Sequence, residues 1–258
     1  MVAGAGLLAA VAVRPGRSPL PPAQEERRIT TASKGASTTY AERSRHGFTV
    51  RVDLRLEGER RDAGDRALAV LDAQLLQITR RLRPAPLERL RAVPIWLSLD
   101  DPVAPCACYH PSPGWLAANG FDPRKAGAVE IARAETFVEW TREQPWMVLH
   151  ELAHGYDDLH LDPAGELGRE LEALLGKARE SGRYDSVLHW DGARTRHYAL
   201  NSSEEYFAES SEAWLGQNDF FPFVAPELVE FDPGMAAFMR KVWGEPLNSQ
   251  DASRPTGR

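Results

Sequence analysis

The chain has 258 residues, of which 43% are hydrophobic and 26% charged, a composition that excludes a disordered chain and allows one domain of roughly 200 residues. Its formal net charge is -6, and no long run of lysine or arginine is present, so the sequence argues against nucleic acid as a partner.

The first residues are expected to be a targeting segment rather than part of the fold. Residues 2–13 are small and apolar, too few to span a bilayer, and are followed by Arg14, which is typical of a signal-peptide core. We therefore expect a secreted or extracytoplasmic protein without a membrane span. Residues 1–45 are predicted to be this start plus a disordered tail, residues 46–245 the domain, and residues 246–258 a second disordered tail.

The first half of the domain is predicted to form a small sheet. Alternating apolar residues predict a strand over residues 48–56, apolar residues at helical spacing predict a helix over 65–82, and further strands are expected at 93–99 and 128–132. The proline-rich stretch 100–126 is expected to be an irregular loop. It contains Cys106 and Cys108, for which a strained disulfide and two free thiols both remain open.

The second half is predicted to be mainly helical. A helix should begin near Pro145, a hairpin should turn at Asp191-Gly192, and further helices should cover residues 203–215 and 232–243. The predicted fold class is therefore α+β, with a small mixed sheet that leads into a helical half.

The central motif is His150-Glu151-Leu152-Ala153-His154, which lies in the middle of a predicted helix. Residues four apart project from the same helix face, so His150 and His154 can bind one tetrahedral zinc ion. Glu151 lies about 100° round the helix, where its carboxylate reaches water rather than the metal. These residues predict a catalytic zinc site with Glu151 as the general base.

A third protein ligand is expected on the helix that starts near Ser203. Glu205 and Glu209 are four residues apart and share a face, so one can bind zinc while the other accepts a ring N–H from a ligand histidine. The fourth position of a catalytic zinc stays open for water, whose pKa the metal lowers to about 7.

Together, the segments HELAH at 150–154 and YALNSSEEYFAE at 198–209 resemble the catalytic part of the anthrax lethal factor-like metallopeptidases, a family of gluzincins. The resemblance covers about residues 145–215, and it implies a zincin-like domain with an edge strand, expected at 128–132, beside the motif helix. It also implies a zinc-dependent metalloendopeptidase that acts on a peptide or protein. The implied ligands are His150, His154 and Glu205, and Glu209 is expected to support a ligand histidine. Glu151 is the implied base, and Tyr198 is the implied phenol that stabilises the oxyanion.

Two alternatives remain open. A pseudo-peptidase would keep zinc only for structure or binding, although such a site has no use for Glu151. The metzincins place a third histidine six residues after the second, and His160 has this spacing. That pattern needs a glycine where this chain has Asp157, and a continuous helix would turn His160 away from the metal, so the sequence favours Glu205.

Overall fold

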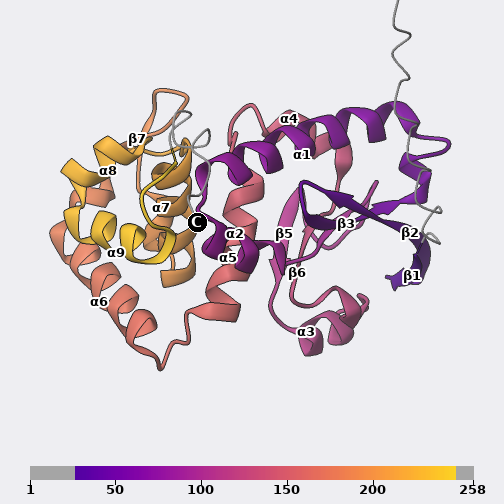
Figure 1. Ribbon diagram of the computed structural model, residues 1–258, viewed down its shortest axis with the longest axis horizontal. Coiled ribbons are helices and arrows are strands. Elements are labelled where there is room, and N and C mark those ends of the chain that lie inside the picture. The colour runs from indigo at the N-terminus through magenta and orange to yellow at the C-terminus, as the bar shows by residue number, and fades with distance from the viewer. Residues whose placement is uncertain (1–26, 248–258) are drawn as a thin grey trace, which may run out of the picture.

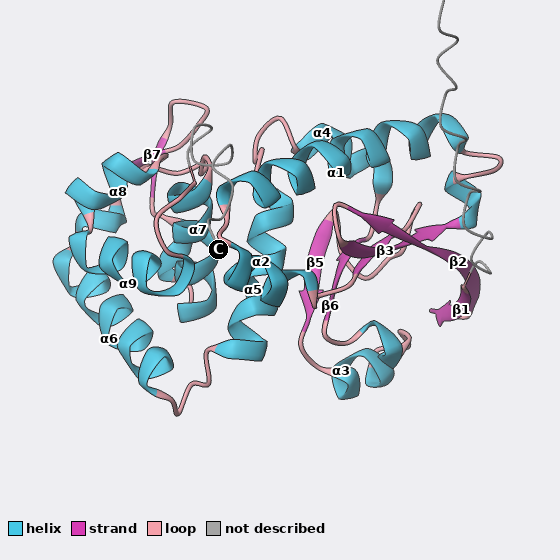
Figure 2. Cartoon of the chain, viewed as in Figure 1, coloured by secondary structure: helices cyan, strands magenta, loops and turns pink. Residues whose placement is uncertain are grey.

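The computed structural model of the chain describes residues 27–247. The predicted signal-like start and all but the first two residues of the predicted C-terminal tail lie outside the described residues. Most strands gather on one side of the molecule together with several helices, and the remaining helices form the other side (Figures 1 and 2). This is the predicted α+β class.

The predicted strands and helices occur in the predicted order, with further strands and helices before and between them. The strands are β1 (Arg28–Ser33), β2 (Ala36–Arg45), β3 (Phe48–Asp53), β4 (Ile95–Leu97), β5 (Ala107–His110), β6 (Ala128–Ile131), β7 (Val187–Leu188) and β8 (Arg194–Thr195). The α-helices are α1 (Arg61–Arg81), α2 (Pro84–Arg91), α3 (Pro113–Ala118), α4 (Ala134–Trp140), α5 (Met147–His160), α6 (Glu166–Ser181), α7 (Ser203–Leu215), α8 (Ala225–Phe231) and α9 (Pro233–Trp243).

Six of the strands form one mixed sheet in the order β1-β2-β3-β4-β6-β5. The strands β3, β4 and β6 are parallel, while β1, β2 and β5 are antiparallel to their neighbours. Helices connect the parallel strands, as crossover connections require. The small hairpin β7–β8 turns at Asp191-Gly192, as the sequence predicts.

The expectation of a tail up to residue 45 is wrong from Arg28 onward, because β1 and β2 form a hairpin that extends the sheet. Lys34 and Gly35 turn the chain with φ angles of 48° and 84°, and glycine tolerates such angles well. The strands carry threonine pairs such as Thr30 and Thr39, whose hydroxyls lie 3.0 Å apart. Because many residues of these strands are polar and β-branched, the sequence shows little alternation of apolar and polar residues from which the strands could be predicted.

The predicted edge strand is also wrong. Residues 128–131 form β6, which lies between β4 and β5 and is buried along its whole length. The edge is β5, inside the segment predicted to be an irregular loop. Its four residues are too few to establish a period of two against the surrounding prolines.

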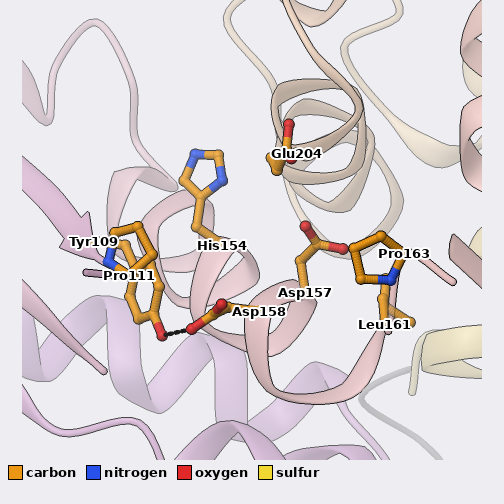
Figure 3. Close-up of a pocket in the computed structure, with 8 residues that line it drawn as sticks. All are labelled: Tyr109, Pro111, His154, Asp157, Asp158, Leu161, Pro163 and Glu204. Carbon is orange, nitrogen blue, oxygen red and sulfur yellow. Dashed lines mark hydrogen bonds between the residues drawn. The ribbon is translucent and has the colours of Figure 1, made fainter. Parts of the chain in front are cut away.

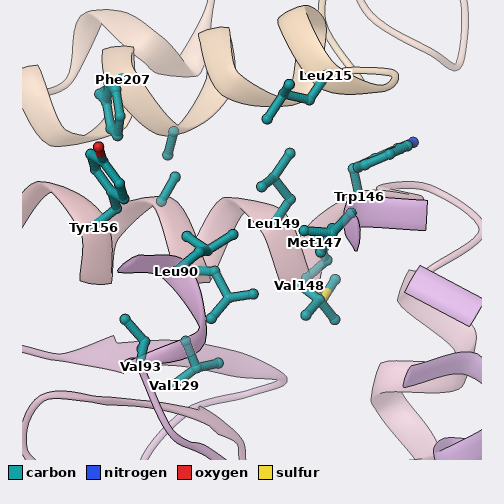
Figure 4. Close-up of a cluster of buried hydrophobic side chains, with 14 of the residues drawn as sticks. Leu90, Val93, Val129, Trp146, Met147, Val148, Leu149, Tyr156, Phe207 and Leu215 are labelled. Carbon is teal, nitrogen blue, oxygen red and sulfur yellow. The ribbon is translucent and has the colours of Figure 1, made fainter. Parts of the chain in front are cut away.

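Helix α5 lies between the sheet and α7 and is the central element of the core. Its side chains pack on β6 and α2 on one side and on α7 on the other (Figure 4). Gln74 of α1 accepts a hydrogen bond from the backbone N–H of Val148 at 3.0 Å, which satisfies a donor in the first turn. Among residues 27–247, no helix has the length and apolar character that a membrane span requires.

Candidate metal centre

The candidate site lies where the middle of α5 faces the first two turns of α7. Burial on both sides fixes α5, so that His150 and His154 project toward α7 from consecutive turns. Ser202 caps α7, because its hydroxyl accepts a hydrogen bond from the backbone N–H of Glu205 at 3.2 Å. Glu205 is therefore held in the first turn of α7, opposite the two histidines.

Three side-chain atoms converge at this point. The Nε2 atoms of His150 and His154 lie 3.2 Å apart, and the Oε2 atom of Glu205 lies 3.2 Å from the first and 3.5 Å from the second. The three residues form a group whose ligand atoms all lie within 4.8 Å of one another, so they could hold a metal ion. The structure thus brings together the three residues that the sequence singled out as ligands.

The Glu205 side chain is ionised near neutral pH. Although burial acts to raise its pKa, the neighbouring His150 and His154 lower the pKa to about 2. Its Oε2 atom is buried without a hydrogen-bond partner of good geometry in the described structure. A buried, ionised oxygen of this kind is suited to bind a cation.

A second carboxylate, that of Glu212, orients the His150 ring through its Nδ1 atom. The Nδ1 atom of His150 lies 2.8 Å from Oε1 of Glu212, and the same oxygen accepts a hydrogen bond from Nε2 of Gln144 at 2.8 Å. Burial acts to lower the pKa of His150, but Glu205 and Glu212 raise it well above its ordinary value. Glu212 therefore fixes the ring so that Nε2 faces the candidate metal position.

Glu209 was the residue expected in this supporting role, and here the structure differs from the prediction. Its Oε1 lies 3.9 Å from Nδ1 of His150, beyond hydrogen-bonding distance, while Glu212 makes the contact. Positions 205, 209 and 212 share one face of α7, so a rule based on a spacing of four found Glu209 and missed Glu212. Glu209 is fully buried, and burial together with Asp219 raises its pKa well above the ordinary value.

Glu151 lies on the side of α5 that faces the segment leading into β5. Burial raises the pKa of the Cys106 thiol to about 12 and also raises the pKa of the Cys108 thiol. The negative charge of Glu151 adds to both increases. Both cysteines are free thiols. Within the described part of the chain, the Glu151 carboxylate forms no hydrogen bond or ion pair.

Tyr198 lies near Glu205, in a single 3₁₀ turn (Tyr198–Leu200) that precedes α7. Its side chain is 47% exposed, and the charge of Glu205 raises the pKa of its phenol. The phenol thus stays protonated near neutral pH and can donate a hydrogen bond.

His160 does not join the cluster. Helix α5 continues without a break through Asp157 to His160, whose exposed ring packs on Tyr156 with ring centroids 4.9 Å apart. Met235 and Met239 are buried within α9 rather than in a turn beneath the histidines. The geometry of the metzincin alternative is therefore absent from residues 27–247.

Comparisons of the chain with protein-family models, with curated proteins and with solved structures found no match.

Proposed function

We propose that the chain is a zinc-dependent metallopeptidase of the gluzincin type, with His150, His154 and Glu205 as ligands. The observation that carries the proposal is the separation of the three donor atoms, which are 3.2, 3.2 and 3.5 Å apart. Donors at about 2.0–2.1 Å from a tetrahedral zinc ion are about 3.3 Å apart. Two histidines and one carboxylate are also a ligand set typical of catalytic zinc.

When bound, zinc supplies a Lewis acid that polarises a peptide carbonyl and makes water more acidic. Glu151, which forms no hydrogen bond or ion pair among residues 27–247, accepts the proton from the attacking water and passes it to the leaving amine. Tyr198 donates a hydrogen bond to the oxyanion that forms at the carbonyl. Glu212 keeps Nδ1 of His150 protonated, so that Nε2 is the nitrogen left to bind.

The surrounding fold supports a zincin-like arrangement. The edge strand β5 runs antiparallel to β6 and packs beside α5, which carries both histidines. An exposed sheet edge can bind an extended peptide through main-chain hydrogen bonds. The sheet and the motif helix would then present a peptide bond to the candidate metal centre, where Glu151 and Tyr198 could act on it.

The decisive variant is Glu151→Gln. We expect it to retain one zinc ion per chain and to lose about 10²- to 10⁴-fold in the rate of peptide hydrolysis, because the base is removed while the ligands are untouched. Elemental analysis and cleavage of an unfolded protein, each with and without a chelator, measure the two properties. Glu59→Gln, at an exposed position outside the cluster, is the matched control.

Two results would contradict the proposal. A wild-type chain that binds no zinc after purification and resupply would remove the metal site. A zinc-loaded chain whose hydrolysis is unaffected by Glu151→Gln would remove the role of the base.

A further inference from the structure

A short segment joins Tyr198 to Glu205, and its conformation decides where the phenol lies relative to the ligand carboxylate. The segment begins with the 3₁₀ turn Tyr198–Leu200 and leads directly into α7. The first turn of α7 borders open space on one side, because Glu204 lines a cavity of about 390 Å³ beside His154 (Figure 3). Contacts that fix the segment must therefore come from other directions.

The position of the Tyr198 ring depends mainly on the backbone of this turn. The side chain is exposed, so packing restrains it little. A hydrogen-bond donor contributes to catalysis only if it is held close to the place where negative charge develops. Whatever fixes the two ends of the turn therefore also fixes the phenol.

Arg179 of α6 holds the end of the turn. Its Nε and Nη2 atoms donate hydrogen bonds to the carbonyl oxygen of Leu200 at 3.2 and 2.8 Å, and Nη2 also donates to the carbonyl oxygen of Asn201 at 3.1 Å. Arg196 donates to the same Leu200 oxygen at 3.1 Å. Hydrogen bonds from a charged donor are roughly twice as strong as neutral ones. Arg179 forms no ion pair among residues 27–247, so its charge acts on these carbonyls.

His197 holds the beginning of the turn. Its Nδ1 atom accepts a hydrogen bond from the backbone N–H of Ala199 at 3.1 Å, which is the contact by which a capping residue stabilises a first turn. The ring is buried between Phe220 and Tyr184, with centroids 4.9 and 5.2 Å away. Burial lowers the pKa of His197 to about 3, so the ring is neutral and Nδ1 can keep the lone pair that accepts.

We infer that Arg179 and His197 are positioning residues, which hold the turn from both ends and thereby keep the Tyr198 phenol near Glu205. Neither belongs to the groups that could hold a metal ion among the described residues, so both act through Tyr198. The inference rests on the proposed function for the role of the phenol in hydrolysis, but the position of the ring can be measured without hydrolysis.

The kinetic test begins with Arg179→Met, which keeps a long unbranched side chain and removes the guanidinium. Zinc content and KM should stay near the wild-type values while kcat falls on the order of tenfold, because a displaced donor stabilises the transition state less. His197→Leu should act in the same direction. His197→Asn should keep more of the rate than His197→Leu, since its side-chain oxygen can accept the hydrogen bond from Ala199.

Arg91→Met is the matched control. The Nε and Nη2 atoms of Arg91 donate to the carbonyl oxygen of His46 at 3.1 and 2.7 Å, which is nearly the geometry found at Leu200, but they connect the end of α2 to the loop before β3. This variant should leave kcat unchanged. A double-mutant cycle separates positioning from a general loss of stability: in a Tyr198→Phe chain, Arg179→Met should cause no further fall in kcat.

Fluorine NMR follows the ring itself. The zinc-supplied chain is labelled with 3-fluorotyrosine, and the Tyr198 resonance is assigned by its absence from Tyr198→Phe. Arg179→Met should shift or broaden this resonance, because the turn gains freedom, whereas Arg91→Met should leave it unchanged. Circular dichroism checks the fold of each variant.

An unchanged Tyr198 resonance in Arg179→Met would overturn the inference. So would an unchanged kcat, or a fall in kcat that is equally large in the Tyr198→Phe chain. The proposed function is decided separately. A changed resonance in a zinc-loaded chain that hydrolyses no peptide would support the positioning of Tyr198 and contradict the proposed function alone.

Discussion

Three glutamates on one face of α7 differ in pKa and in hydrogen bonding because their surroundings differ. Glu205 is close to two histidines, which lower its pKa to about 2. Glu209 is buried near another acid, and its pKa is raised. Glu212 accepts hydrogen bonds from His150 and Gln144. Sequence spacing places these three glutamates on the same face of α7. Which of them can bind a cation depends on the neighbouring side chains of α5 and of the loop that follows α7.

The contrast between Glu205 and His160 leads to a prediction about metal content. Glu205→Ala removes one of the three converging donors and should abolish tight zinc binding. His160→Ala should leave zinc content near normal, because the His160 ring packs on Tyr156 away from the cluster. Zinc per chain, measured after dialysis against a weak chelator, decides between them. The opposite pattern would restore the metzincin alternative.

Tyr198 permits a separate kinetic prediction. Tyr198→Phe removes the phenol without removing the ring, so zinc content and KM should remain near the wild-type values while kcat falls on the order of 10²-fold. Steady-state kinetics on a quenched fluorescent peptide would measure both constants. An unchanged kcat would reject the role of the phenol as an oxyanion donor.

At the scale of elements, the sequence predicts several of the helices that have a clear apolar period. The helices α1, α7 and α9 lie within a few residues of their predicted bounds, and α5 begins close to its predicted start at Pro145, because each carries an apolar face and three of them follow a proline or a serine cap. The hairpin β1–β2 and the edge β5 were missed. Both are short or largely polar, and both are stabilised by pairing with strands distant in sequence, which a local pattern cannot reveal.

Helix α5 shows why one small residue matters for the position of the histidines. At Gly155, a Cβ atom would lie 2.9 Å from both methyl carbons of Val93 and 3.1 Å from the Tyr109 ring. The helix therefore approaches the sheet more closely than alanine would allow. This contact holds the end of α5 against β5, beside the cavity that adjoins His154.

We therefore expect Gly155→Ala to destabilise the chain. Overpacking costs about 1–3 kcal/mol, which outweighs the gain of up to about 1 kcal/mol that alanine brings to a helix. Gly176→Ala in α6 is the matched control, because a Cβ there meets nothing within 4 Å. It should stabilise the chain slightly. Urea unfolding of both variants measures the difference, and equal stabilisation would show that α5 can move away from Val93.

At the scale of the whole molecule, one hydrophobic core extends through both halves. It includes residues of β3, β4 and β6, of α1 and α5, and of α7 and α9 in a single cluster. The sheet and the helical half should therefore unfold together in one transition. A metal ion held by α5 and α7 would add a direct link across the centre of this core.

This link predicts the effect of metal on thermal unfolding. An ion present at about a thousandfold excess over its Kd stabilises the folded state by about 4 kcal/mol, if it does not bind the unfolded chain. For a domain of this size, each kcal/mol raises Tm by about 2–4 °C, so zinc should raise Tm by roughly 8–16 °C. Calorimetry of the metal-free and zinc-loaded chain should show a single transition in both states. Glu205→Ala should lose the shift, whereas Glu151→Gln should retain it, because Glu151 is not part of the donor cluster. An equal shift in Glu205→Ala would mean that zinc stabilises the chain from another position.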